Sequence, residues 1–167
     1  MRTIVLAVML ILAGAGAAGA QTARQQVLRA AVLARPALDG VTLAGLTLGR
    51  EEAEVLALLG PAHGTGASRI AERALRYDVA RGVRLDVHVR AGRVAGIAVT
   101  ARAQLPSPQT ARGVRLGMPV ARVLEIYGPA TGGRLWYAAE GVAFNVDAPA
   151  DTVYSILIFP RGTAPSW

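Results

Sequence analysis

The sequence has 167 residues, 53% of them hydrophobic, and a formal net charge of +7 at pH 7. It contains no cysteine, which excludes disulfides, thiolate metal sites and a lipid-anchoring cysteine. Every basic residue is an arginine, and the arginines are scattered rather than grouped, so no nucleic-acid partner is expected. The charge either attracts an acidic surface or reflects arginine-rich codon usage.

The first 20 residues have the pattern of a secretory signal peptide. Arg2 precedes the apolar run Ile4–Leu12, and small residues then lead to Ala18-Gly19-Ala20. The strongly apolar run is too short for a membrane-spanning helix, which needs about 20 such residues. We therefore expect export, cleavage after Ala20, and a periplasmic or secreted mature protein without a lipid anchor.

Residues 21–40 are predicted to form an N-terminal helix and extension. The helix has a weak alanine stripe beside Arg24, Arg29 and Arg35. Two interpretations follow from this pattern: the segment packs on its own domain or frays, or its arginines meet an anionic membrane surface.

Two segments of the chain repeat each other. Residues 45–64 and 113–132 are identical at ten of twenty aligned positions, including two Gly-Pro pairs in register. Each segment predicts a short helix that ends where the glycine takes a positive φ and the proline prevents continuation. The helices are expected over Arg50–Leu59 and Pro119–Tyr127.

Alternating apolar and polar residues predict three antiparallel strands after each helix. The clearest of them are Val83–Val89, Val94–Thr100, Val142–Val146 and Thr152–Phe159. The sequence therefore predicts an α+β fold of two tandem helix–three-strand repeats, with the helices packed on one face of a joint sheet. The expected boundaries are repeat 1 at residues 41–100, a linker at 101–112, repeat 2 at 113–159 and a tail at 160–167.

The second copy resembles the SmpA/OmlA family of small bacterial envelope proteins. The resemblance rests on Gly113-Val114-Arg115-Leu116-Gly117-Met118, Val123-Leu124, Gly128-Pro129 and Leu135-Trp136-Tyr137. It implies help in assembling outer-membrane β-barrels. Two such units in tandem are also similar to the β-lactamase-inhibitor-protein fold, in which the open face of a sheet binds a partner protein.

Candidate binding residues lie on the predicted outward face of the sheet. If Tyr77 and Tyr137 point toward the helices, the side chains next to them point away. The residues expected on this face are Arg76, Asp78, Arg84, Asp86, His88, Trp136 and Asn145. Tryptophan and arginine are enriched at the centres of protein-binding patches, so we expect a partner here. The alternative is that the N-terminal helix or the tail covers Trp136.

The sequence offers little support for catalysis. Asp78 and Asp86 are either paired carboxylates or parts of a salt-bridged surface. The serines lack a G-x-S-x-G context, and neither histidine has metal-ligand spacing, so no cofactor is expected. An enzyme would have to use Asp86 and His88 in a concave pocket with a shifted pKa.

The expected function is therefore a non-enzymatic protein-binding module of the bacterial cell envelope, acting on another envelope or secreted protein. An outer-membrane assembly accessory and an inhibitor of another exported protein are two versions of this expectation. An exported enzyme is the remaining alternative.

Overall fold

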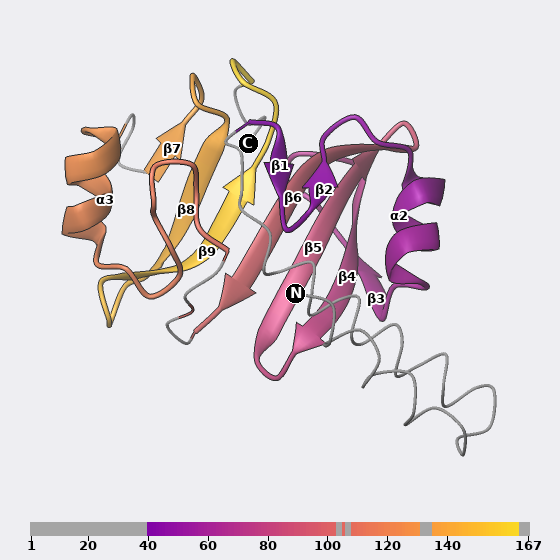
Figure 1. Ribbon diagram of the computed structural model, residues 1–167, viewed down its shortest axis with the longest axis horizontal. Coiled ribbons are helices and arrows are strands. Elements are labelled where there is room, and N and C mark those ends of the chain that lie inside the picture. The colour runs from indigo at the N-terminus through magenta and orange to yellow at the C-terminus, as the bar shows by residue number, and fades with distance from the viewer. Residues whose placement is uncertain (1–39, 103–104, 106–107, 131–134, 164–167) are drawn as a thin grey trace, which may run out of the picture.

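Seven antiparallel strands form one continuous sheet in the computed structural model (Figure 1), which describes residues 40–102, 105, 108–130 and 135–163. The order of the strands is β3-β4-β5-β6-β9-β8-β7. The predicted signal peptide, the N-terminal helix with Arg24, Arg29 and Arg35, and the end of the tail lie outside the described residues.

Six of the seven strands of this sheet follow the period-two alternation that the sequence predicts, whereas the short strand Gly64–Gly66 was not predicted. The strands are β3 (Gly64–Gly66), β4 (Arg73–Ala80), β5 (Val83–Arg90), β6 (Arg93–Ala101), β7 (Leu135–Tyr137), β8 (Val142–Asp147) and β9 (Thr152–Ile158). In β5, which lies between β4 and β6, Leu85 and Val87 are fully buried, whereas Arg84 is exposed. Each long strand therefore has one face in the core and one face outward.

The β6–β9 pair holds the two halves of the sheet together. Val99 lies opposite Ile156 and Ile97 opposite Ile158, and all four side chains are fully buried. The two edge strands, β3 and β7, have only three residues each.

Two eight-residue helices, α2 (Glu52–Leu59) and α3 (Val120–Tyr127), lie at opposite ends of the sheet (Figure 1). Each ends as predicted, at a glycine with φ of 75° in Gly60 and 85° in Gly128. Pro119 is the N-cap of α3 rather than its first helical residue. The N–H of each of these glycines donates to the helix carbonyl four residues earlier, at 2.8 Å in both cases.

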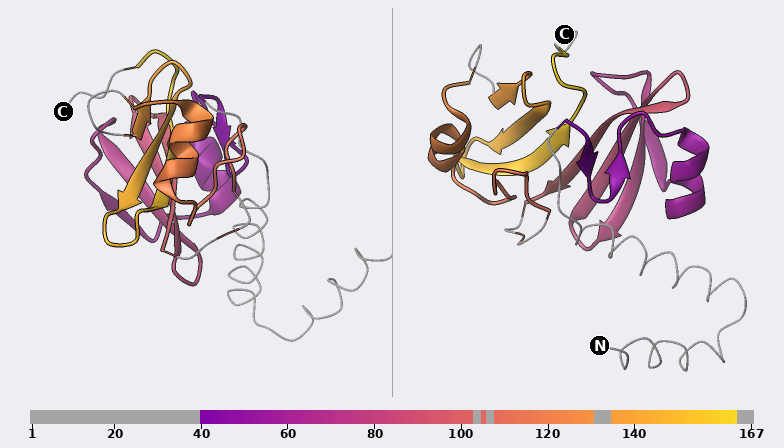
Figure 2. Two further views of the ribbon diagram at one scale, coloured as in Figure 1. Left: turned by 90° about the vertical axis from the view of Figure 1, so that its left-hand side faces the viewer. Right: turned by 45° about the horizontal axis from the view of Figure 1, so that its top comes forward.

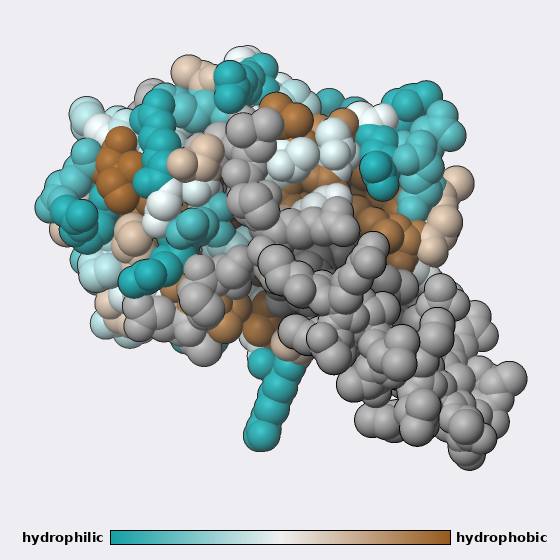
Figure 3. All heavy atoms as spheres, in the orientation of Figure 1, coloured by the Kyte–Doolittle hydropathy of each residue, from teal (hydrophilic) through white to brown (hydrophobic). Residues whose placement is uncertain are grey.

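A small hairpin covers the middle of the inward face. It consists of β1 (Thr42–Leu43) and β2 (Leu46–Thr47), and the views in Figures 1 and 2 place it in front of the sheet between the helices. Leu43 and Leu46 are fully buried. On this side of the molecule, Figure 3 shows hydrophilic residues around the rim and apolar residues beside the hairpin.

The predicted fold class, two tandem helix–three-strand repeats with the helices over a joint sheet, is wrong. Strand predominates over helix among the described residues, and the strands form one seven-stranded sheet plus the hairpin. An eight-residue helix is about 12 Å long, whereas seven strands span about 29 Å, so two such helices cannot cover the face. The hairpin, with the buried Val114 and Leu116 of the segment before α3, fills the space between them.

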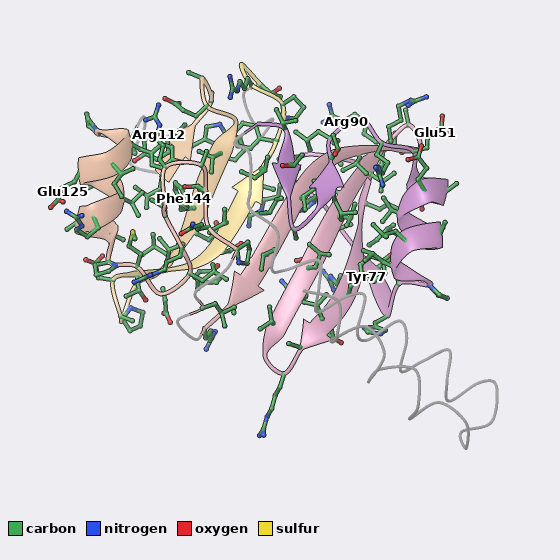
Figure 4. All side chains as sticks on the ribbon, viewed as in Figure 1. Glu51, Tyr77, Arg90, Arg112, Glu125 and Phe144 are labelled. Carbon is green, nitrogen blue, oxygen red and sulfur yellow. The ribbon has the colours of Figure 1, made fainter. Side chains whose placement is uncertain are left out.

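Two tyrosines fix which face of the sheet turns inward. The Tyr77 hydroxyl lies 3.4 Å from the Gly60 carbonyl oxygen, and the Tyr137 hydroxyl donates to the Gly128 carbonyl at 3.0 Å. Figure 4 shows Tyr77 between the sheet and α2. Both side chains point toward the helices, as predicted, so the neighbouring side chains on β4 and β7 point outward.

Candidate functional site

The outward face of the sheet contains a hollow of about 640 Å³. Arg84, Asp86 and His88 of β5 line one side together with residues 67–70, and Trp136 of β7 lines the opposite side. The floor between them comes from β6, β9 and β8. The hollow therefore spans the join between the two halves of the sheet.

Strand register arranges the floor in two rows that run across the strands. One row contains Asp86, Ala98, Leu157, Ala143 and Trp136, and the next contains Arg84, Thr100, Ser155 and Asn145. We call Ala98, Leu157 and Ala143 the apolar row, and Thr100, Ser155 and Asn145 the polar row. The Thr100 hydroxyl donates to the Ser155 hydroxyl at 3.1 Å. The hollow thus offers hydrocarbon on one side and hydrogen-bonding groups on the other.

Residues 67–70, which we call the strap, form part of the wall. The Ser68 hydroxyl lies 2.8 Å from Nδ1 of His88. Ile70 lies directly over Gly96, since a Cβ at that glycine would be 2.3 Å from the Ile70 Cδ1. A side chain at position 96 would therefore require the end of the Ile70 side chain to move.

Charged side chains alternate across β4 and β5. Arg76 lies opposite Asp86, and Asp78 lies opposite Arg84, so the two carboxylates do not face each other. Oδ2 of Asp86 accepts from Nε of Arg84 at 2.9 Å, while Nε of Arg76 is 3.9 Å from Oδ1. Of the two alternatives for these carboxylates, the geometry supports the salt-bridged surface.

Five of the seven predicted site residues line the hollow: Arg84, Asp86, His88, Trp136 and Asn145. Arg76 and Asp78 are on the same face but outside it. Trp136 is half-buried, and its ring stacks on Phe159 at a centroid distance of 4.2 Å. The alternative that the N-terminal helix or the end of the tail covers Trp136 concerns residues outside the described part of the chain.

Sequence reasoning missed the strap, which is part of the wall, and Phe159, which supports the Trp136 ring. The sequence marks Ser68 only as a serine without a G-x-S-x-G context, and Phe159 only as the end of a predicted strand. A usable signal was present in the small outward residues Gly96, Ala98 and Ala143, which interrupt the expected bulky or polar side chains and lower the floor.

Burial lowers the pKa of His88 from its ordinary value of about 6.5, and the nearby Asp86 carboxylate opposes this shift. The unfolded chain then takes up this proton at a higher pH than the folded protein does. Stability from the neutral imidazole is present above about pH 6.5 and is lost as the pH falls.

We therefore expect the urea concentration at the midpoint of unfolding to be lower at about pH 5.5 than at about pH 7.5. His88→Gln should flatten this dependence. His63→Gln replaces the other imidazole of the sequence and should keep it. A midpoint that is equally pH-dependent in wild type and His88→Gln would contradict the assignment.

The Ser68–His88 pair does not have the arrangement of a catalytic triad. The Ser68 hydroxyl oxygen also accepts from the Ile70 N–H at 3.2 Å, which is a local turn contact. Asp86 is bonded to Arg84, and its Oδ1 has no hydrogen-bond partner, so it does not orient the imidazole. These contacts anchor the strap.

Two further features concern the described part of the chain. No group of three or more His, Cys, Asp or Glu side chains there could hold a metal ion. None of the helices there has both the length and the apolar character needed to cross a membrane.

No protein-family model and no curated protein matches the sequence. Two solved structures are similar in shape. One is an extracellular protein containing an SCP domain from Bacillus anthracis, with 11% identity, a TM-score of 0.49 and coverage of 68% of this chain and 44% of that one. The other is a cysteine-rich secretory protein from Staphylococcus aureus, with 9% identity, a TM-score of 0.50 and coverage of 77% and 48%.

These neighbours are not SmpA/OmlA proteins. The resemblance to that family is therefore wrong, and the outer-membrane assembly role that it implied has no support from these neighbours. The motif that suggested it has a local explanation, because Gly117 and Gly128 adopt φ of 81° and 85° at turns that favour glycine in any fold. This chain spans less than half the length of each neighbour, at 44% and 48%.

Proposed function

We propose that this protein is an exported, non-enzymatic binding module whose hollow holds a segment of another envelope or secreted protein. The observation that supports this proposal most is the hollow on the outward face of the sheet, which has side-chain walls on two opposite sides. The stacked Trp136 ring forms one wall, and the Arg84–Asp86 pair forms the other.

The dimensions and composition of the hollow suit this role. Its volume of about 640 Å³ lies within the range of about 300–1,000 Å³ that is typical of ligand sites. Tryptophan and arginine are the residues most often found at the energetic centres of protein interfaces. Both walls are held by contacts within the protein, which reduces the entropy that binding would cost.

A second candidate is an exported enzyme, and one observation favours it. Asp86 and His88 line the same concave site, and burial lowers the pKa of His88. The Ser68–His88 contact of 2.8 Å would then be a nucleophile–base pair. If p-nitrophenyl acetate hydrolysis exceeds the buffer rate and disappears in Ser68→Ala, this candidate replaces the binding module.

Site-specific photocross-linking tests the proposed function. Benzoylphenylalanine is placed at Asn145, which is exposed at the end of the polar row, and at Glu125, which is exposed on α3 at one end of the sheet (Figure 4). The protein is irradiated in its native exported fraction. We expect a discrete adduct with an exported protein from position 145 only, and its loss when Trp136→Ala is added.

Circular dichroism of Trp136→Ala provides the folding control for this experiment. Equal adducts from positions 145 and 125, or an adduct that persists in folded Trp136→Ala, would remove the hollow as the binding site.

A further inference from the structure

We infer that the segment held in the hollow is extended and acidic, with an apolar side chain three to four residues from a carboxylate. The inference rests on the proposed function and adds the chemistry of the partner. It comes from the charge balance at one end of the hollow and from the half-buried hydrocarbon of Leu157 and Trp136 at the other.

The charge balance of the lining favours an anion. The charged lining residues are Arg69, Arg84 and Asp86, and burial lowers the pKa of His88, which favours its neutral form. The lining therefore carries two arginines and one carboxylate, and Arg76 approaches that carboxylate from outside the hollow at 3.9 Å. A segment bearing a lysine or arginine would add to this excess of positive charge.

Asp86 is also poorly placed to receive a cation. The residue is only 7% exposed, its Oδ2 already accepts from Arg84, and its Oδ1 is buried from solvent. The Arg84 side chain, by contrast, is 47% exposed. Its bond to Asp86 uses Nε, so the two terminal nitrogens remain in position for a bidentate bond to a carboxylate.

The apolar row provides the second contact. Ala98 and Ala143 are short and Leu157 is half-buried, so an apolar side chain of the partner can rest between them and the Trp136 ring. The row lies two residues along the strands and about two strands across from Arg84. These steps are about 7 Å and about 10 Å, giving a diagonal of about 12 Å. An extended chain covers that distance in roughly three to four residues.

Peptide binding tests the inference with a built-in reporter. Trp167→Phe makes Trp136 the only tryptophan of the full chain, so its fluorescence reports on the hollow. The probes are acetyl-Ala-Leu-Thr-Ser-Glu-Ala-amide, the same peptide with lysine in place of glutamate, and both peptides with the leucine and the charged residue exchanged. We expect saturable binding of the peptides with one of the two orders of leucine and charged residue. In that order, the glutamate peptide should bind about tenfold more tightly than the lysine peptide.

Three variants assign the contacts. Arg84→Gln should remove the preference for glutamate, whereas Arg81→Gln, at an exposed turn position, should keep it. Ala98→Leu should fill the apolar row and abolish binding of every peptide, with circular dichroism confirming that the variant is folded.

Equal binding of glutamate and lysine peptides, or binding by none of them, would overturn the inference. An adduct from Asn145 in the cross-linking experiment would then leave the proposed function standing. The absence of that adduct together with the absence of peptide binding would end both.

Discussion

Ile156→Ala is expected to lower the free energy of unfolding by about 2–5 kcal/mol. Ile156 is fully buried in β9 and lies opposite Val99 of β6 on one side and Phe144 of β8 on the other. Truncation removes apolar surface from the core and leaves a cavity at the join of the sheet. Urea denaturation followed by circular dichroism measures the loss.

Leu124→Ala is the matched control, because Leu124 is 40% exposed on α3. Its effect should stay within about 0.5 kcal/mol. In the Trp167→Phe background, the fluorescence of Trp136 reports on the β7 end of the sheet, while circular dichroism reports on the whole. The two transitions should coincide because the sheet is continuous. Separate transitions, or equal losses in the two variants, would contradict this account of the core.

Gly141→Ala is expected to cost about 3–4 kcal/mol, from a strained backbone and a direct clash. Gly141 has φ of 72°, and an added Cβ would lie 2.4 Å from the Phe159 carbonyl oxygen and 2.6 Å from the Gly40 Cα. These contacts involve backbone atoms, which cannot rotate away as a side chain could. Because Phe159 stacks on Trp136, the clash should also change the tryptophan fluorescence.

Gly82→Ala separates the two contributions. Gly82 has the same φ of 72°, but an added Cβ there would meet nothing within 4 Å. We expect Gly82→Ala to cost only the strain of a positive φ in an alanine, about 1–2 kcal/mol. If the two variants lose equal stability by thermal or urea denaturation, the close approach at Gly141 is not significant.

Local patterns predicted the individual elements but not their arrangement. The alternation in Val83–Val89 and the glycines at positions 60 and 128 act over a few residues, so the sequence shows their effect directly. The hairpin β1–β2 has strands of only two residues, too short for any period to appear. The placement of the helices at the ends of the sheet depends on tertiary packing, and the prediction of helices over a joint sheet failed there.

For the candidate site, too, the sequence predicted local side-chain directions but not the contacts between distant segments. Alternation was enough to predict that Arg84, Asp86, His88, Trp136 and Asn145 share one face, because side-chain direction is a property of each strand. It did not reveal that the strap crosses that face or that Phe159 supports Trp136, since both contacts join residues far apart in sequence. The family resemblance rested on a glycine motif whose residues adopt positive φ at turns, and such turns occur in many folds.

The three-residue edge strands have a consequence for behaviour at high concentration. An open sheet can recruit further chains through the unpaired amide and carbonyl groups along its outermost strands. Here β3 and β7 present only three residues each, and two of the three in β3 are glycines, which are poor strand formers. A ribbon of copies joined end to end would therefore have little backbone to grow from, and concentrated solutions of the protein should resist fibril formation.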